Sequence, residues 1–316
     1  MNLVSVVIVA HNSEPEIGAC LEALAGSGAE IIVVDNASGD GTGALALARK
    51  EARWILNPWN RGFAAAANQG IAAAQGEFVL LLNPDAVVLG GLDALQGACA
   101  QPGVAAAGGK LVGPDGRPQV GFMVRRFPSA AVLILEALGV NRLWPGNPAN
   151  RRYRCLDLDP EAPAAVEQPA GAFLMVRREV WRQLGGFDEG FRPLWFEDVD
   201  FLKRAAQAGY SVRYVPEAVA AHGGARSAGR LEWGVREAYW YGNLLRYTAK
   251  HFASSSLRTV CGAVMVGALL RSVVGVLRRG SLKPVGVYGR VVRLAGAYGI
   301  SGRSEGPVCS TAFAVQ

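Results

Sequence analysis

The chain has 316 residues, of which 51% are hydrophobic and 18% are charged. A chain this apolar and this weakly charged is not intrinsically disordered, and its length allows one large domain with an extension or two small domains. The formal net charge of +6 is concentrated near the C-terminus: residues 251–316 contain eight of the 32 Lys and Arg side chains but only one of the 26 acids.

This apolar, basic C-terminal region favours an anionic membrane surface over nucleic acid as its partner, because the rest of the chain is close to neutral. The five cysteines are scattered and form no Cys-x-x-Cys pair, which predicts reduced core thiols and no zinc site. The apolar run 3–10 is too short for the core of a signal peptide. We therefore expect a cytoplasmic protein.

Strands and helices alternate over the first part of the chain. Residues 3–10 form a largely β-branched run that is typical of a central parallel strand covered on both faces. Ser13 and Glu16 form a capping box that predicts a helix through about Leu24. The alternation predicts a doubly wound α/β fold with a mostly parallel sheet. Its further elements are expected as strands at 30–34, 53–56 and 78–82 and helices at 43–51 and 63–75.

Polar residues stand where each of these predicted strands ends. In a doubly wound fold, ligands bind beyond the carboxyl ends of the strands. A single Asx residue there is typical of an ordinary turn, but four consecutive polar strand ends favour a binding cleft. These ends are His11-Asn12, Asp35-Asn36, Asn57-Pro58 and Asn83-Pro84-Asp85.

The regular pattern loosens after Gly113 and resumes near residue 172. We expect residues 117–155 to form an irregular, basic insertion that either contacts an anionic ligand or is a solvated surface loop. Beyond it we expect strands at 172–176 and 211–215, helices at 178–184 and 197–208, and a turn at 185–189.

Asp85 is the first candidate for chemistry. A carboxylate at the tip of a buried strand can hold Mg²⁺ or Mn²⁺, and such an ion commonly neutralises a diphosphate. The alternative is that Asn83-Pro84-Asp85 is an ordinary Asx turn.

The acidic cluster Glu197-Asp198-Val199-Asp200 is the second candidate. Acids at a helix start complement the helix dipole, which is one explanation of the cluster. The other is a general base at Asp198 or Asp200. The apolar and aromatic residues 193–196 would desolvate such a carboxylate and raise its pKa.

His222 is the third candidate, because it precedes a glycine-rich loop at a predicted strand end. It is either a metal ligand or a hydrogen-bonded structural residue. Arg226 in that loop either closes over a phosphate or is an ordinary solvated arginine. No Gly-x-Gly-x-x-Gly follows the first strand, and the chain contains no Walker motif and no Gly-x-Ser-x-Gly elbow. Dinucleotide-binding, P-loop and hydrolase interpretations therefore lose support.

Taken together, these residues resemble glycosyltransferase family 2, in particular its rhamnosyltransferase-like branch. The resemblance covers roughly residues 1–230 and depends on the order and spacing of seven short stretches. They are 5–12, 34–42, 60–70 (Asn60-Arg61-Gly62-Phe63-Ala64 running to Asn68-Gln69-Gly70), 81–86, 185–189, 196–201 and His222.

The resemblance implies a GT-A fold, a nucleotide-diphosphate sugar donor, a divalent metal (Mg²⁺ or Mn²⁺) and inversion at the anomeric carbon by a single in-line displacement. Carried over by position, it implies that Asp198 is the base and that Asp85 and His222 hold the metal. It further implies donor contacts from Asp35 at the nucleotide base, Asn12 near the nucleoside, and Asn60, Arg61 and Asn68 along the pocket. The chain departs from the family's Asp-x-Asp motif at Asn83, where an amide replaces a carboxylate, and this predicts a lower metal affinity.

We therefore expect a transferase domain over residues 1–230 and a helical, amphipathic region over 231–316. The apolar stretch 259–277 is interrupted by Arg271 and falls short of an uninterrupted span of about 20 apolar residues. We expect it to lie at the inner face of the cell membrane, with Arg271, Arg278 and Arg279 reaching toward the headgroups. Alternatively, this helix packs on the catalytic domain or forms a homodimer interface.

A membrane location would suit a polyprenyl-linked or other cell-envelope glycan as the acceptor. The expected donor is dTDP-L-rhamnose. A UDP-hexose donor and a catalytically silent nucleotide-sugar-binding protein are the alternatives. A nucleotidyltransferase is disfavoured, because no basic, glycine-rich loop follows the first strand.

Overall fold

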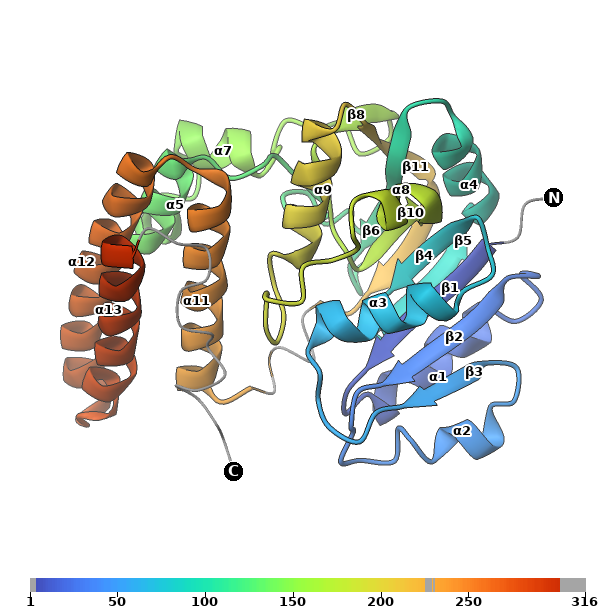
Figure 1. Ribbon diagram of the computed structural model, residues 1–316, viewed down its shortest axis with the longest axis horizontal. Coiled ribbons are helices and arrows are strands. Elements are labelled where there is room, and N and C mark those ends of the chain that lie inside the picture. The colour runs from blue at the N-terminus through green and yellow to red at the C-terminus, as the bar shows by residue number, and fades with distance from the viewer. Residues whose placement is uncertain (1–3, 225–228, 230, 302–316) are drawn as a thin grey trace. The chain divides into compact units, whose positions relative to one another are not determined.

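The computed structural model describes residues 4–224, 229 and 231–301, and the predicted phosphate contact Arg226 lies outside this part. The chain divides into two compact units (Figure 1). Unit 1 comprises residues 1–127, 154–189 and 197–229, and unit 2 comprises residues 128–153, 190–196 and 230–316.

A mixed sheet runs through unit 1. Within the described residues it has nine strands in the order β3-β2-β1-β4-β10-β6-β11-β5, with β8 paired to β11, and β7 and β9 form a separate pair. Strands β10, β5 and β8 run antiparallel to their neighbours and the others run parallel, which confirms the predicted mostly parallel sheet. The strand bounds are β1 Val4–Ala10, β2 Glu30–Asp35, β3 Arg53–Leu56, β4 Phe78–Leu82, β5 Ala86–Gly90, β6 Val104–Val112, β7 Val124–Arg125, β8 Ala164–Val166, β9 Gln168–Pro169, β10 Phe173–Arg177 and β11 Ser211–His222.

Helices cover both faces of this sheet. Strand β1 shows why: Val6 and Ile8 belong to one hydrophobic cluster, and Val7 belongs to the other, as expected when alternate side chains of a buried strand point to opposite faces. Helices α1 and α4 contribute to the first cluster, and α3 and α9 contribute to the second. The helices of unit 1 are α1 Glu14–Ala23, α2 Leu45–Ala48, α3 Phe63–Ala73, α4 Leu92–Ala100, α8 Arg178–Gln183 and α9 Glu197–Gln207.

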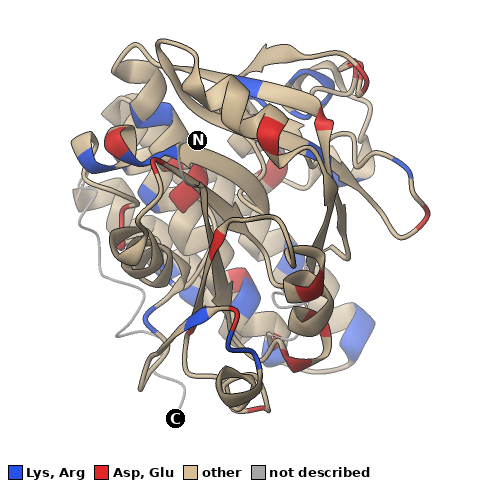
Figure 2. Ribbon diagram, turned by 90° about the vertical axis from the view of Figure 1, so that its right-hand side faces the viewer, with Lys and Arg blue, Asp and Glu red and all other residues tan. Residues whose placement is uncertain are grey.

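Three local predictions for unit 1 are wrong. Ser13 precedes α1 but makes no capping hydrogen bond, because its hydroxyl is engaged with the backbone of His11 instead. The predicted helix 43–51 is only the single turn α2. Strand β11 continues beyond the predicted Val215, with a shift of register around Pro216; a proline lacks the N–H that the ladder needs, so the strand bulges there rather than ending. Acidic and basic residues are interspersed over the described part of unit 1 (Figure 2), in keeping with its near-neutral charge.

Unit 2 is helical. Residues 130–153 form three short helices rather than the predicted irregular insertion, and the segments 128–153 and 190–196 join the C-terminal helices in one unit, whereas the sequence-based division placed them in the first domain. The reason is specific packing: the Arg271 guanidinium donates hydrogen bonds to the carbonyls of Glu136 and Ala137 at the end of α5. The prediction that Arg271 reaches toward lipid headgroups is therefore wrong, because its guanidinium binds these carbonyls. The helices are α5 Ala130–Ala137, α6 Val140–Leu143, α7 Pro148–Tyr153, α11 Trp233–His251, α12 Ser254–Arg279 and α13 Lys283–Ser301.

Candidate active site

The predicted nucleotide-binding residues meet at the ends of β1, β2 and β3. These strands are neighbours and parallel, so their carboxyl ends lie at one edge of the sheet. Asn12 has a positive φ of 54°, which turns the chain after β1 so that its side-chain oxygen accepts a hydrogen bond from Gly39 N at 2.7 Å. Asp35 is buried and accepts from the backbone N and the hydroxyl of Ser38. The structure brings Asn12 and Asp35 together through the loop 38–39.

Asn36 links the same edge to Asn60 and Arg61. It is buried, and its amide donates to Asn60 Oδ1 at 2.9 Å while its oxygen accepts from Asn57 Nδ2 and from Arg61 N. Asn36 therefore holds two of the predicted donor-binding residues in place. The sequence predicts Asn36 only as one of the polar strand ends of a binding cleft, although its position beside Asp35 is a usable signal for this structural role.

Asn68 has a different environment. Its amide nitrogen donates to Phe187 O and Glu189 Oε1, and its oxygen accepts from Phe187 N and Trp181 Nε1. In the structure this side chain secures the turn after α8. A contact between Asn68 and a donor remains a prediction.

Asp85 and His222, the predicted metal ligands, face each other. His222 Nε2 lies 3.6 Å from Asp85 Oδ1, and both side chains are almost fully buried. His222 pairs with Ala86 across β11 and β5, and Gly223 N donates to Asp85 O, so the two residues are fixed by backbone pairing. Burial lowers the pKa of His222, and the charge of Asp85 acts in the opposite direction. We therefore expect His222 to be a neutral imidazole at neutral pH.

These two residues fit a divalent cation. Within the described part of the chain, His222 Nε2 is a buried atom without a hydrogen-bond partner, as expected of a nitrogen whose partner is a metal ion. A group of three or more His, Cys, Asp or Glu side chains placed to hold a metal is absent from the described residues. Asp85 and His222 would thus supply two ligands, and the remaining positions would fall to substrate oxygens and water.

Asp198, the predicted base, lies at the start of α9. Its Oδ2 accepts from Gly171 N at 3.1 Å, and its Oδ1 accepts from Val199 N at 2.8 Å. Burial raises its pKa, while these hydrogen bonds and the charge of Arg125 oppose the rise. The direction of this shift is the one that the sequence predicts for a general base.

The other two acids of the cluster have different roles. Asp200, the alternative base, is fully buried and pairs with Arg204 at 2.8 Å, so its carboxylate is committed to a structural ion pair. Glu197 is also buried, and burial together with the charge of Asp198 raises its pKa well above the ordinary value. Asp198 is thus the partly exposed carboxylate among the three.

The segments that carry Asp85 and Asp198 are linked through the two residues that precede β10. Gly171 N binds Asp198, and the next residue, Ala172, accepts a hydrogen bond from Asn83 N at 3.0 Å. Asn83 opens the turn that carries Asp85. Asp85 and Asp198 are 113 positions apart in the sequence, and these two hydrogen bonds place the segments that carry them next to each other at one edge of the sheet.

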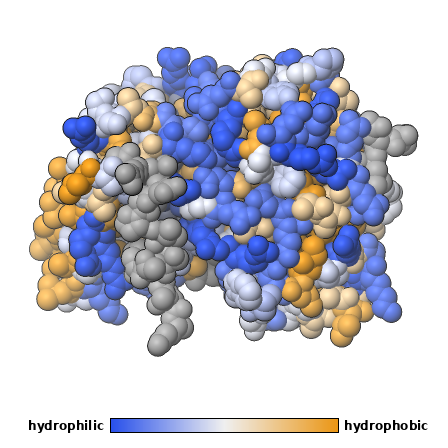
Figure 3. All heavy atoms as spheres, in the orientation of Figure 1, coloured by the Kyte–Doolittle hydropathy of each residue, from blue (hydrophilic) through white to orange (hydrophobic). Residues whose placement is uncertain are grey.

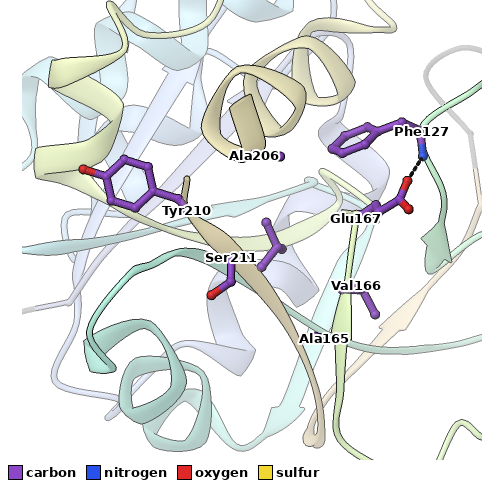
Figure 4. Close-up of a pocket in the computed structure, with 8 residues that line it drawn as sticks. Phe127, Ala165, Val166, Glu167, Ala206, Tyr210 and Ser211 are labelled. Atoms are coloured by element: carbon purple, nitrogen blue, oxygen red, sulfur yellow. Dashed lines mark hydrogen bonds between the residues drawn. The ribbon is translucent and has the colours of Figure 1, made fainter. Parts of the chain in front are cut away.

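A separate pocket opens at the other end of α9. It has a volume of about 240 Å³ and is lined in part by Phe127, Glu167, Ala206 and Tyr210 (Figure 4). Ala206 is eight residues beyond Asp198 on the same helix, or about 12 Å along its axis. This pocket contains none of the predicted site residues and is smaller than typical ligand sites, so it is not the site described above.

The buried thiol of Cys20 lies near the predicted metal ligands. Its Sγ contacts Asn83 O, and burial, with a smaller effect of Asp85, raises its pKa to about 12. A thiol with this pKa is not a nucleophile at neutral pH. The four cysteines within the described residues are free, as the sequence predicted.

Comparison with known proteins identifies similar families and relatives. Residues 5–156 match the model of Glycosyl transferase family 2, and residues 161–297 match that of Glycosyl transferase family group 2. The chain is 35% identical over 215 residues to the N-acetylglucosaminyl-diphospho-decaprenol L-rhamnosyltransferase of Mycobacterium tuberculosis, covering 63% of this chain and 68% of the relative.

Two solved structures share the fold. GalNAc-T7, solved with UDP, GalNAc and Mn²⁺, is 16% identical with a TM-score of 0.54 and covers 79% of this chain and 51% of its own. The mannosyltransferase PcManGT of Pyrobaculum calidifontis, solved with GDP-Man and Mn²⁺, is 18% identical with a TM-score of 0.50. This match covers 95% of the present chain and 87% of PcManGT. The chain therefore belongs to glycosyltransferase family 2: it is a glycosyltransferase with a GT-A fold, similar to the rhamnosyltransferases of that family.

Proposed function

We propose that the chain transfers L-rhamnose from dTDP-L-rhamnose to a hydroxyl of a lipid-linked or other cell-envelope glycan, with inversion at the anomeric carbon. One observation carries the proposal. His222 contacts Asp85, and hydrogen bonds through Gly171 and Ala172 link the segments of Asp85 and Asp198 at one edge of the sheet. The L-rhamnosyl group and the lipid-linked acceptor are inferred from the 35% identical relative, whose name states both. The dTDP part of the donor follows from the family resemblance alone.

Each residue has a distinct part in the proposed reaction. Asp35, with Asn12 and the Asn60-Arg61 loop, would bind the nucleoside part of the donor. Asp85 and His222 would hold Mg²⁺ or Mn²⁺, which when bound neutralises charge on the diphosphate. Asp198 would take the proton from the acceptor hydroxyl as its oxygen attacks the anomeric carbon and the bond to the diphosphate breaks. General-base help of this kind contributes about 10²–10⁴-fold to the rate.

We also propose that unit 2 contacts the inner face of the cell membrane. Among the described residues, α12 is the single helix that is long and apolar enough to cross a bilayer, but one face of it is packed within unit 2. Its opposite face exposes Val266, Leu269, Val273 and Leu277, which recur at helical spacing and form an apolar stripe. Hydrophobic residues gather along the edge of unit 2 where α12 lies (Figure 3). A helix with one face packed on protein is better suited to lie in the interface than to span it.

Charge favours lipid over a second copy of the chain as the occupant of this stripe. Arg278, Arg279 and Lys283 are exposed at the end of the stripe, and the described residues after 251 contain no acid. In a symmetric dimer across this face, like charges would meet. An anionic leaflet instead attracts each exposed Lys or Arg by about 1 kcal/mol.

A thermal-shift screen of dTDP-L-rhamnose, UDP-hexoses and GDP-mannose, with and without Mn²⁺, tests the donor assignment. A donor at 100 times its Kd stabilises the protein by about 2.7 kcal/mol. We expect the largest Mn²⁺-dependent shift with dTDP-L-rhamnose. A larger shift with a UDP-hexose would reassign the donor. A clear shift without release of nucleotide in the presence of glycan acceptors would favour the catalytically silent alternative.

A further inference from the structure

Gln119 lies against the proposed metal ligand His222. Gln119 Nε2 donates to the backbone carbonyl of His222 at 3.0 Å, and Gln119 Oε1 lies 3.2 Å from His222 Nδ1. The backbone of Gln119 is itself fixed, because its N–H donates to Leu111 O at the end of β6 and its carbonyl accepts from Phe122 N and Met123 N. The amide is therefore presented to His222 from a held position.

The two contacts fix which imidazole nitrogen carries the proton. A carbonyl oxygen only accepts hydrogen bonds, so the group facing His222 O must be the NH₂ of Gln119. Its oxygen then faces Nδ1, and since that oxygen also only accepts, Nδ1 must carry the proton. Nε2 is left with a lone pair. The backbone of His222 thus sets the orientation of Gln119, and Gln119 sets the tautomer of His222.

This tautomer leaves two electron-rich atoms facing each other. The lone pair of Nε2 lies 3.6 Å from Asp85 Oδ1, both are buried, and Nε2 has no hydrogen-bond partner within the described part of the chain. Two buried acceptors at this distance repel each other unless a cation lies between them. The ring is also held in orientation by Phe122, whose centroid lies 5.3 Å away with the two planes 9° apart.

We propose that Gln119 is a positioning residue that prepares His222 to bind a divalent cation by holding its Nε2 unprotonated and directed toward Asp85. The proposal rests on the metal assignment made above. Partners of this kind on the second nitrogen of a metal-binding histidine typically change metal affinity by about 10–100-fold.

The test is the affinity of Mn²⁺, measured by electron paramagnetic resonance of free Mn²⁺ in the presence of dTDP and, in parallel, UDP. We expect Q119L to raise the Kd of Mn²⁺ by about 10–100-fold. Q119E retains an oxygen for the Nδ1 proton, so we expect its Kd to lie nearer that of the wild type. The matched control is Q183L, which removes an exposed glutamine bonded to Glu179 and Tyr210 in the same unit and should leave the Kd unchanged. D85A and H222A should abolish binding.

A second readout separates positioning from general structural damage. The chain has three histidines, so ¹⁵N spectra of histidine-labelled, metal-free protein report the tautomer of His222 directly. We expect a proton on Nδ1 in the wild type and in Q119E, and loss of this fixed tautomer in Q119L. An unchanged Mn²⁺ Kd and tautomer in Q119L would overturn the proposal while leaving the metal site intact. Absence of Mn²⁺ binding to the wild type with either nucleotide would overturn the metal site and, with it, this proposal.

Discussion

Replacing Asp198 with asparagine separates its proposed catalytic role from its structural one. Asparagine keeps the size of the side chain and one of its two acceptor oxygens, but it cannot take a proton from the acceptor hydroxyl. We expect Asp198→Asn to lower kcat by at least about 10²-fold, the lower end of the contribution of a general base. Nucleotide binding should be retained, because Asp198 lies outside the cluster around Asp35 and Asn36.

The stability of this variant follows from two opposing effects. The lost oxygen leaves either Gly171 N or Val199 N without its hydrogen bond, at a cost of about 1 kcal/mol. Against this, burial raises the pKa of Asp198, so its charged form is disfavoured in the folded state and asparagine removes that unfavourable term. The sign of the pH dependence follows: stabilisation by the protonated carboxyl is complete below its ordinary pKa of about 3.9 and is lost as pH rises through the raised pKa. We expect this part of the pH dependence to be absent from the variant.

The assays are nucleotide release at saturating donor and acceptor, and urea unfolding between pH 4 and pH 8. Asp93→Asn is the matched control, since Asp93 is an exposed acid in the first turn of α4 and its replacement should leave kcat unchanged. In the wild type, kcat/KM should fall as pH is lowered through the pKa of Asp198, because the base becomes protonated. A kcat within a few-fold of the wild-type value in Asp198→Asn would refute the assignment of the base.

Two further predictions concern Glu197 and α12. Burial and the charge of Asp198 raise the pKa of Glu197. Glu197→Gln should therefore increase the free energy of unfolding at pH 8 and have little effect near pH 4. Urea unfolding at both pH values checks this, and an equal effect at the two pH values would contradict it. The double variant Val273→Asp/Leu277→Asp should reduce cosedimentation with vesicles of anionic phospholipid by at least about 10-fold, because burying an apolar side chain of this size is worth about 1.5–3 kcal/mol. Both residues are exposed, so its unfolding midpoint should stay unchanged; Leu47→Asp on α2 is the exposed control, and undiminished vesicle binding would remove the membrane proposal.

The sequence predicted unit 1 well where each element carries its own signal. Strand β4 is a fully apolar run and β1 is apolar except for Ser5, and a strand with this pattern has to be covered on both faces. The sequence signal for the helix after Asn60-Arg61 was equally clear. The small residues of this helix allow it to pack closely on the sheet: a Cβ on Gly70 would lie 2.4 Å from Val7 Cγ1. The local pattern and the tertiary packing require the same residues at these positions, so the pattern alone is sufficient to predict these elements.

Unit 2 shows where the pattern fails. Residues 117–155 are rich in Arg, Pro and Gly, and these residues usually indicate loops. Yet α5 forms there, with Ser129 as its cap, and Arg271 from far along the chain binds the carbonyls at its C-terminus. The sequence predicted that the Arg271 side chain reaches toward lipid headgroups, because it does not show which distant carbonyls are available to this guanidinium.

The site residues that the sequence missed have a common cause in the direction of the strands. Searching beyond the carboxyl ends of strands finds Asn12, Asp35 and Asp85, because β1, β2 and β4 run parallel. Strand β10 runs antiparallel to β4, so the residue that it brings to this edge, Gly171, precedes the strand instead of following it. Strand β6 does run parallel, but Gln119 follows it by seven residues, after the chain has turned back to bind Leu111 O. The edge at the carboxyl ends of parallel strands therefore also receives residues that precede antiparallel strands and residues that return after a turn. In this chain, one residue of the first kind binds the proposed base and one of the second kind binds a proposed metal ligand.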